Sequence, residues 1–284
     1  MPTTTPRQKF RAMMAADGMI VAPGVYDGLT ASLVERAGFS AAYMTGAGTS
    51  VARGYPDFGL ITMTEMIQNA DMIAGTIDVP LIADADTGYG NELNVTRTVR
   101  DYERTGVAAI HIEDQGFPKK CGHLDDKEVI PAEEFVAKIR AAVAARRDPD
   151  FTIIARTDSR AVIGFEEALR RSNMALEAGA EIAFLEAPRS LDELKAVTRE
   201  VKGPCLYNLV NGGKTPVLTI AEAEAMGFKL AILPGFLLAN IIGTCEQLLG
   251  ALKRDGKVPP VVNGVSVRDI FERVGADEWD ALRP

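Results

Sequence analysis

The chain has 284 residues, of which 47% are apolar, and this is enough to form one large hydrophobic core. Its formal net charge is −8 and it contains no basic run, so neither nucleic acid nor an anionic membrane surface is an expected partner. The apolar runs are too short to span a membrane, no apolar signal region follows the polar first ten residues, and the three cysteines show no paired spacing, which together predict a cytoplasmic protein.

One unit recurs along the chain: an apolar run, a polar or glycine-containing turn, and then an amphipathic helix. The apolar runs predict eight strands, at residues 20–23, 41–44, 79–83, 107–112, 151–155, 181–185, 204–207 and 229–233. The first predicted helix runs through Ala37, and Gly38 is well placed as the residue after its cap. Eight such units predict a single α/β domain over residues 1–284, a (β/α)₈ TIM-type barrel, with a doubly wound sheet as the alternative.

The third predicted strand leads directly into two carboxylates, Asp84 and Asp86, and a loop with two glycines. Residues two apart in a strand point to the same side, so both acids are expected to face one site. Two anions this close need a cation between them, and Mg²⁺ with its oxygen ligands suits that position. A pair of solvated loop acids that caps the next helix remains the alternative at this point.

Polar residues also follow most of the other predicted strands. The residues at the strand ends are Thr45, Asp84, Asp86, Glu113, Arg156, Glu186 and Asn208. In a barrel the carboxyl ends of all strands converge on one face, where active sites form. Inward-facing charges need partners, so this pattern favours a charged site over ordinary loop polarity.

The loop after the fourth predicted strand has the sequence GFPKKCGHL over residues 116–124. Cys121 stands beside two lysines and close to His123, a setting that predicts a lowered thiol pKa. The glycines and the proline predict a loop that closes over a site as a lid. The cysteine and histidine spacing does not form a zinc site, and no G-x-S-x-G nucleophile motif occurs in the chain.

The segment KKCGH at residues 119–123 resembles the signature of the isocitrate lyase and phosphoenolpyruvate mutase superfamily. Further matching segments follow in the right order: YPDFG at 55–59, DADTGYG at 84–90, IEDQ at 112–115, ARTD at 155–158, and Asn208 with GGKTP at 212–216. The resemblance extends from about residue 23 to about residue 250. Chain length and segment detail are most similar to the group of 2-methylisocitrate lyase, 2,3-dimethylmalate lyase and oxaloacetate hydrolase, the petal death protein.

The resemblance implies an α/β barrel whose last helix is swapped between subunits of a homotetramer, a dimer of dimers. The C-terminal segment, about 256–284, would then pack on a neighbouring subunit. A loop would close over the substrate, which would be a small dicarboxylate or tricarboxylate with a 2-hydroxy or 2-keto group. The implied cofactor is Mg²⁺, with Mn²⁺ as a possible substitute.

The resemblance also implies roles for individual residues. Asp84 would be the most direct metal ligand. Asp86 and Glu113 would lie in the coordination sphere or just outside it and contact the metal through water. Asp57 would lie near the metal-bound waters or the substrate. Arg156 would pair with a substrate carboxylate. The other residues implied to bind the substrate are Tyr43, Thr45, Gly46, Ala47, Lys119, Gly122, His123, Glu186, Asn208 and Pro234.

The implied reaction is Mg²⁺-dependent C–C cleavage of a 2-methylisocitrate or 2-alkylmalate to a 2-keto acid and a carboxylate. Cys121 would be the general acid that protonates the carbanion. The alternatives are an oxaloacetate acetylhydrolase, a carboxyphosphonoenolpyruvate-type phosphonomutase, and an inactive barrel that acts as a binding subunit. Thr45 and Ala47 depart from the pattern of the lyases, as does Leu233 before Pro234, so the exact substrate does not carry over. His111, Cys205 and Cys245 are interpreted as structural core residues.

Overall fold

The structure is a computed structural model, which describes residues 4–283. Its eight strands are β1 (Ile20–Val25), β2 (Ala42–Met44), β3 (Leu81–Asp84), β4 (Ala109–Glu113), β5 (Thr152–Thr157), β6 (Ile182–Leu185), β7 (Leu206–Asn208) and β8 (Leu230–Leu233). All pairs are parallel, in the order β6-β5-β4-β3-β2-β1-β8-β7, and a parallel bridge between Ala183 and Cys205 brings β6 beside β7. The predicted barrel is thus confirmed, with strand boundaries within two residues of those expected.

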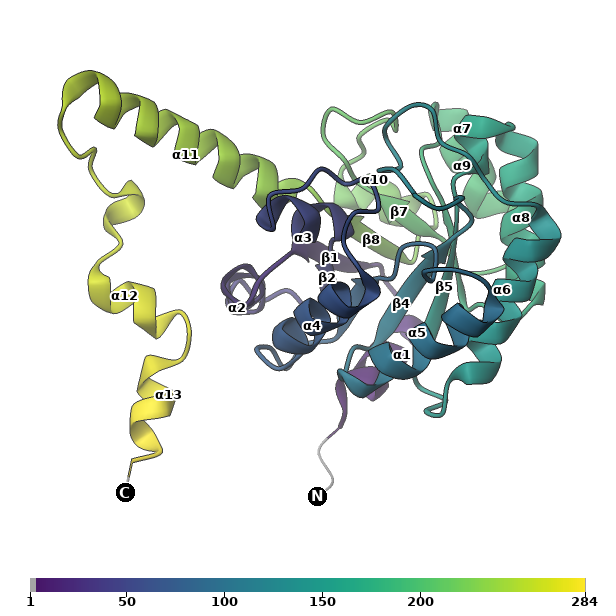
Figure 1. Ribbon diagram of the computed structural model, residues 1–284, viewed down its shortest axis with the longest axis horizontal. Helices are drawn as coiled ribbons and strands as arrows, with labels where there is room; N and C mark the ends of the chain where they lie inside the picture. Colours follow the sequence, from purple (N-terminus) through teal and green to yellow (C-terminus); the bar gives the residue numbers. More distant parts are fainter. Residues whose placement is uncertain (1–3, 284) are drawn as a thin grey trace.

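Helices follow the strands and cover the outside of the barrel (Figure 1). They are α2 (Gly28–Arg36), α3 (Gly46–Ala52), α4 (Met63–Ala74), α5 (Glu92–Arg104), α6 (Ala132–Ala145), α7 (Ser159–Val162), α8 (Phe165–Glu177), α9 (Leu191–Glu200) and α10 (Ile220–Ala225). As predicted, α2 is capped at Ala37 and is followed by Gly38 at φ +87°, a conformation that glycine adopts without steric cost.

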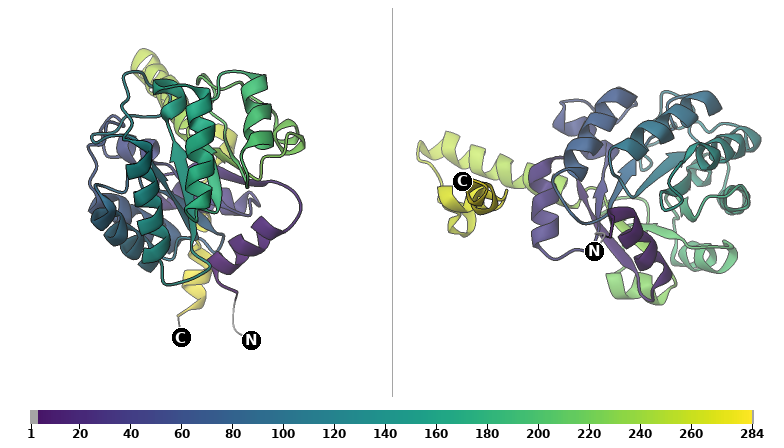
Figure 2. Two further views of the ribbon diagram at one scale, coloured as in Figure 1. Left: turned by 90° about the vertical axis from the view of Figure 1, so that its right-hand side faces the viewer. Right: turned by 90° about the horizontal axis from the view of Figure 1, so that it is seen from below.

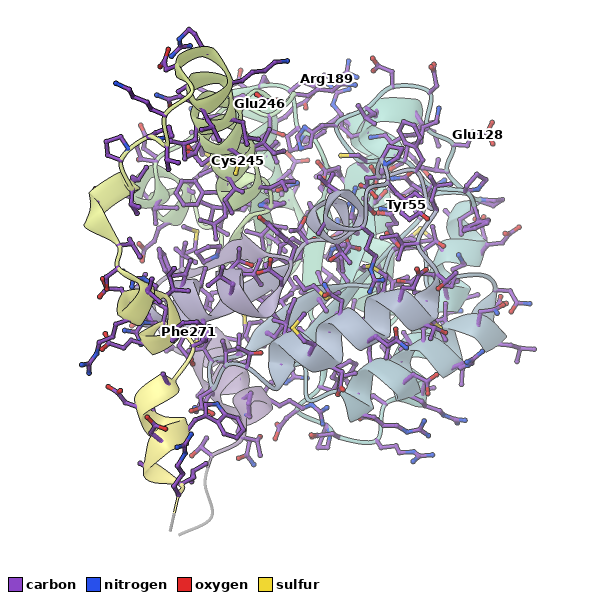
Figure 3. The ribbon with its side chains drawn as sticks, turned by 60° about the vertical axis from the view of Figure 1, so that its left-hand side comes forward. Tyr55, Glu128, Arg189, Cys245, Glu246 and Phe271 are labelled. Carbon is purple, nitrogen blue, oxygen red and sulfur yellow. The ribbon has the colours of Figure 1, made fainter. Side chains whose placement is uncertain are left out.

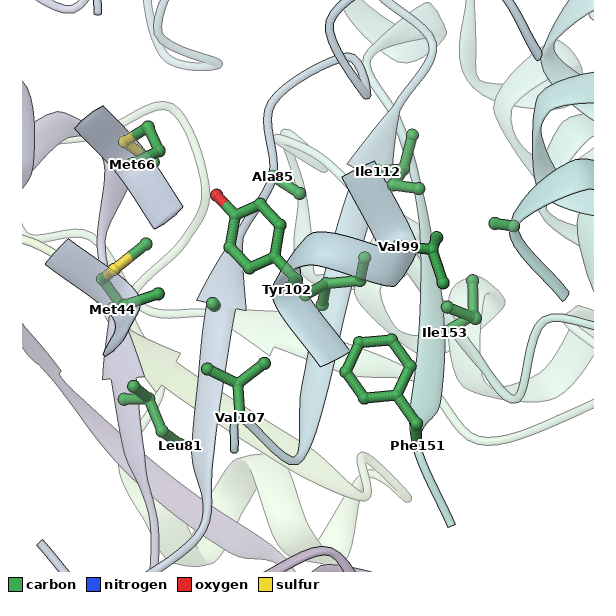
Figure 4. Close-up of a cluster of buried hydrophobic side chains, with 14 of the residues drawn as sticks. Met44, Met66, Leu81, Ala85, Val99, Tyr102, Val107, Ile112, Phe151 and Ile153 are labelled. Carbon is green, nitrogen blue, oxygen red and sulfur yellow. The ribbon is translucent and has the colours of Figure 1, made fainter. Parts of the chain in front are cut away.

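The largest part of the core lies between the outer helices and the sheet. Tyr102 and Val99 of α5 pack there with Phe151 and Ile153 at β5 (Figure 4). Tyr102 also donates a 2.8 Å hydrogen bond to the backbone carbonyl of Asp84, so this helix supports the end of β3. The core therefore fixes the position of a predicted site residue.

A helix that the sequence pattern did not reveal, α1 (Pro6–Ala15), lies below the N-terminal end of the barrel (Figure 2). Its Phe10 is fully buried and packs with the residues inside the barrel, which include Ile82 and Ile154. The helix begins at a Thr5 capping box and a proline in its first turn. This end of the barrel is therefore filled by apolar side chains, and polar chemistry is left to the opposite face.

The C-terminal arm consists of α11 (Phe236–Asp255), the 3₁₀ turn Val262–Gly264, α12 (Val267–Glu272) and α13 (Ala276–Ala281) (Figure 1). α11 extends away from the barrel, and the chain then turns back, so that Ser32 and Arg36 of α2 donate hydrogen bonds to the carbonyls of Arg273 and Glu272. None of the residues in these helices is buried, and Trp279 is 72% exposed. Cys245 on α11 and Phe271 on α12 belong to this arm (Figure 3), so the interpretation of Cys245 as a core thiol is wrong, whereas Cys205 is buried as expected. Packing of this arm on a neighbouring subunit stays a prediction. Within residues 4–283 no helix is both long and apolar enough to cross a membrane.

Candidate active site

A cavity of about 210 Å³ lies at the carboxyl ends of the strands, on the face opposite α1. Twelve residues expected from the sequence line it: Tyr43, Thr45, Ala47, Asp57, Asp84, Cys121, Gly122, His123, Arg156, Glu186, Asn208 and Pro234. Phe184, Val210 and Gly235 line it as well, and no sequence pattern marks them, because apolar and glycine residues occur throughout the barrel. The other expected residues, Gly46, Asp86, Glu113 and Lys119, are buried beside these lining residues.

Asp84 and Asp86 are brought together by a turn. β3 ends at Asp84, so strand alternation does not orient Asp86, and this part of the sequence interpretation is wrong. Asp86 instead adopts a left-handed conformation at φ +46°, and its N–H donates to Asp84 Oδ1 at 2.9 Å. Asp84 Oδ2 accepts the N–H of Gly46 at 3.2 Å, where a Cβ would lie only 2.4 Å from that oxygen. Only glycine therefore fits at this position of the site.

Lys119 neutralises the acids around it. Its Nζ lies 2.6 Å from Asp57 Oδ1 and 2.6 Å from Asp86 Oδ1, and its side chain is 5% exposed. Burial raises the pKa of Asp86 to about 6, although the lysine opposes this shift. Burial also acts against ionisation of Asp84, but His111, Lys119 and Arg156 outweigh it and lower the pKa of Asp84 to about 2. Asp84 is thus held ionised, whereas Asp86 titrates at about pH 6.

Arg156 at the end of β5 joins three carboxylates. Its Nε lies 2.9 Å from Asp158 Oδ2 and 3.2 Å from Glu113 Oε2, and its Nη2 lies 3.7 Å from Glu186 Oε2. The guanidinium carbon lies 5.0 Å from the centre of the Phe184 ring. Burial raises the pKa of Glu113 well above its usual value in spite of the arginine. The guanidinium is therefore fixed in direction at the wall of the cavity, where it can receive an anion.

The acids at the ends of β3 and β4 have the chemistry of a divalent-cation site. Glu113 Oε1 is buried without a hydrogen-bond donor, and the only cations beside Asp86 Oδ1 and Glu113 Oε2 are those of Lys119 and Arg156. Hard oxygen donors of this kind suit Mg²⁺, which takes few carboxylates and keeps several waters. Among the residues that the structure describes, no three acidic, cysteine or histidine side chains surround a point closely enough to hold an ion directly. The donor set therefore fits an ion held partly through water, with Asp84 as its cavity-lining carboxylate.

Cys121 lies in the segment between β4 and α6, where its N–H donates to the backbone carbonyl of Asp57 at 3.1 Å. Burial raises the pKa of the Cys121 thiol, and the charge of Asp57 adds to the effect. The expected lowering of this pKa is therefore wrong. The Lys119 ammonium is paired with Asp57 and Asp86, so its charge is not available to a thiolate. A thiol that stays protonated at neutral pH is suited to donate a proton.

The family model described as phosphoenolpyruvate phosphomutase matches residues 10–253. The chain belongs to the PEP mutase/isocitrate lyase superfamily.

Two curated relatives within this superfamily are lyases. The 2,3-dimethylmalate lyase of Eubacterium barkeri is 47% identical over 90% of this chain and 89% of its own length. The 2-methylisocitrate lyase of Aeropyrum pernix is 41% identical over 98% of this chain and 90% of its own length. These relatives confirm the prediction of an enzyme of the isocitrate lyase superfamily.

Two solved structures with the same fold are complexes with a small organic acid. An oxaloacetate acetylhydrolase in complex with the inhibitor 3,3-difluorooxalacetate matches with a TM-score of 0.95 and 40% identity, over 98% of this chain and 96% of that one. A phosphonopyruvate hydrolase in complex with oxalate and Mg²⁺ matches with a TM-score of 0.88 and 33% identity, over 98% of both chains. Members of this superfamily thus bind small dicarboxylates, and one of them does so with Mg²⁺.

Glu186 and Asn208 also line the cavity, together with His123. Asn208 Nδ2 donates to Glu186 Oε2 at 3.0 Å, and His123 Nε2 lies 3.0 Å from Glu186 Oε1. The Lys214 N–H donates to His123 Nδ1 at 3.1 Å, which places the ring proton on Nε2, toward the glutamate. Burial acts to raise the pKa of Glu186, but Arg156 and His123 outweigh it and lower that pKa to about 2. Glu186 is thus an ionised acceptor.

His111, interpreted from the sequence as structural, is buried at the edge of the site. Its Nε2 lies 2.8 Å from the Tyr43 hydroxyl and 3.4 Å from Asp84 Oδ1. Burial lowers the pKa of His111 to about 4 and raises the pKa of Tyr43 well above its usual value. The pair is therefore a neutral imidazole and a neutral phenol in hydrogen-bond contact, and the phenol lines the cavity.

Proposed function

We propose that the protein is a Mg²⁺-dependent lyase that cleaves a C–C bond of a 2-alkylmalate or 2-methylisocitrate type of substrate. The observation that carries this proposal is the position of Cys121. A thiol with a raised pKa lines the same cavity as Asp84 and Arg156. This arrangement offers an anion-binding cation, an acid cluster for a metal and a separate proton donor, as the cleavage requires.

The cavity suggests the class of substrate. Arg156 offers a fixed guanidinium for a carboxylate, and the volume of about 210 Å³ suits a small organic acid rather than a nucleotide. Ala47, Phe184, Val210 and Pro234 add apolar surface to the lining. An apolar lining of this kind supports a substrate that carries alkyl substituents next to its carboxylates.

The metal would be held by Asp84, with Asp86 and Glu113 through water. When bound, Mg²⁺ supplies electrostatic stabilisation to negative charge that develops on the substrate oxygen. The phosphonopyruvate hydrolase that matches this fold was solved with oxalate and Mg²⁺, and this supports a divalent cation in the present chain.

The residues of the chain would divide the work as follows. Arg156 binds and orients a carboxylate, and the Tyr43 phenol hydrogen-bonds the 2-oxygen. The proton of the 2-hydroxyl passes to the acid cluster beside Asp84, where the pKa of Asp86 is about 6. The C2–C3 bond breaks, the electron pair stays on C3, and C2 becomes the carbonyl of a 2-keto acid. Cys121 Sγ then gives its proton to C3, and the thiolate is reprotonated before the next turnover.

One other activity has a specific observation in its favour. The matching oxaloacetate acetylhydrolase has a TM-score of 0.95, and such an enzyme uses water to cut the same type of bond. Both cleavages leave a carbanion that must be protonated, so the thiol suits either reaction. The 47% identity to a 2,3-dimethylmalate lyase supports the lyase.

The test is incubation of the protein with 2-alkylmalates, 2-methylisocitrate and oxaloacetate, each with and without Mg²⁺. Release of a 2-keto acid from the malates or from 2-methylisocitrate is the expected result. If oxaloacetate is the one compound of the panel that reacts, and it gives oxalate, the protein is a hydrolase instead. No product from any member of the panel would reject both and leave a phosphonomutase or a binding subunit.

A further inference from the structure

Lys127 is a buried lysine in the segment that carries Cys121, and it does not line the cavity. Its side chain is only 1% exposed, although its neighbours Asp125, Asp126 and Glu128 are exposed. Lys127 Nζ lies 3.1 Å from Asp158 Oδ1 and donates a hydrogen bond to the backbone carbonyl of Gly122. Because lysine is almost never buried without a partner, these two contacts are what hold it inside the protein.

Both partners of Lys127 adjoin residues of the proposed chemistry. Gly122 directly follows Cys121 in the chain. Asp158 follows β5, is fully buried, and accepts hydrogen bonds from Arg156 Nε at 2.9 Å and Nη2 at 3.3 Å. One ammonium group therefore connects the backbone beside the thiol to the carboxylate that orients the guanidinium.

The segment around Cys121 packs directly on the strand ends. A Cβ added at Gly122 would lie 2.4 Å from Arg156 Nη2 and 2.7 Å from Glu186 Cγ. The backbone at Gly122 therefore packs so closely against Arg156 and Glu186 that no side chain fits between them. Lys119 and His123 of the same segment pair with Asp57, Asp86 and Glu186, which we assign to the site itself. Asp114, where the segment begins, pairs with Arg171 of α8 and accepts the N–H of Asp158.

We propose that Lys127 is a positioning residue that fastens the segment 114–131 onto the barrel through Asp158 and so places Cys121 Sγ at the cavity. The inference rests on the proposed role of Cys121 as proton donor. Lys127 does not itself line the cavity, and it acts through its neighbours Gly122 and Asp158. Without the ammonium, Asp158 still pairs with Arg156, so the barrel stays folded. The segment loses the charged contact beside Gly122 and keeps those of Lys119 and His123.

The test compares Lys127→Met with Lys127→Arg, which keeps the charge, and with Lys120→Met as the matched control. Lys120 is in the same segment, and its Nζ donates only to the backbone carbonyl of Asp126 at 3.0 Å. Alkylation of Cys121 by iodoacetamide is followed by peptide mass spectrometry without substrate. We expect Lys127→Met to raise the rate at Cys121 about 10-fold to 100-fold, the factor for loss of a hydrogen bond to a charged group.

Lys127→Arg is expected to alkylate at Cys121 more slowly than Lys127→Met, and Lys120→Met at the rate of the wild type. On a substrate that the panel identifies, Lys127→Met should lower kcat by about the same factor and change KM little, because Arg156 and Asn208 stay on their strands. A purely structural role would lower stability without changing the alkylation of Cys121. An unchanged alkylation rate in folded Lys127→Met overturns the proposal.

A measurement on the wild type covers the case in which Lys127→Met does not fold. An amine-reactive reagent should modify Lys127 far more slowly than Lys120, and equal rates overturn the proposal. Neither labelling experiment needs a substrate. Failure of the lyase assignment can therefore be told apart from failure of this proposal. In that case Lys127 and Cys121 still react slowly with the two labelling reagents, but no compound of the panel is turned over.

Discussion

Replacement of Lys119 by methionine tests how the acid cluster is balanced. Lys119 Nζ lies 2.6 Å from both Asp57 and Asp86, whose side chains are 11% and 8% exposed. Methionine has a similar length but no charge, so the substitution leaves two nearly buried carboxylates without their cation. Removal of one partner of a buried ion pair costs about 3–5 kcal/mol, and we expect this loss in the free energy of unfolding at pH 8.

The loss of unfolding free energy in Lys119→Met should become smaller as the pH falls. The pKa of Asp86 is raised to about 6 in the folded protein, so its ionisation disfavours the folded state as the pH rises from about 4 through 6. Lys119 opposes this effect because it lowers the pKa of Asp86. Without the lysine the penalty of ionisation grows, and protonation of the acid removes it. The destabilisation by Lys119→Met is therefore expected to be smaller at pH 5 than at pH 8.

Urea unfolding at pH 5 and pH 8, at one protein concentration, measures this difference. Lys120→Met is the control, because Lys120 Nζ contacts only a backbone carbonyl, and a change within about 0.5 kcal/mol is expected. A loss of less than about 1 kcal/mol at pH 8, or a loss that does not shrink at pH 5, would show that Lys119 does not neutralise the cluster.

Three further outcomes are expected. Cys121→Ser should lower turnover by at least about 10²- to 10⁴-fold while the fold and Mg²⁺ binding persist, and near-normal rates would refute the role of general acid. Treatment with a chelator should abolish activity and added Mg²⁺ or Mn²⁺ should restore it, and calorimetry should show no Mg²⁺ binding to Asp84→Ala; full activity after chelation would reject the metal. Light scattering at micromolar concentration should give the mass of a tetramer, and a monomer mass would count against the proposed packing of the C-terminal arm.

The barrel and the location of its site could be predicted because they depend on local pattern. Apolar runs of four to six residues mark the strands, and polar residues such as Glu113 and Arg156 follow them directly. Parallel strands in a barrel bring those ends to one face, whatever the loops do. The position of Cys121 at the cavity likewise follows from its place in the loop after β4.

The contacts that tune the site were not predictable, because they join segments far apart in the sequence. The lysine next to Cys121 suggested an activated thiol, but Lys119 turns toward Asp57, which belongs to another segment. Lys127 stands in a charged stretch and resembles a solvated residue, yet it is buried against Asp158. In both cases the partner is set by the folded path of the loop, which has no periodic pattern from which to infer it.

The site also contains conformations that run against local preference. Asp86 has φ +46° and Ala187, directly after Glu186, has φ +55°. A residue other than glycine costs on the order of 1 kcal/mol in this region, so the surrounding structure must hold it there. The Glu113 N–H donates to the carbonyl of Asp86 at 2.9 Å, and the Glu186 N–H donates to that of Thr157 at 3.0 Å. Hydrogen bonds from neighbouring strands thus fix the acids before any substrate binds, and such preorganisation is what a site for developing negative charge requires.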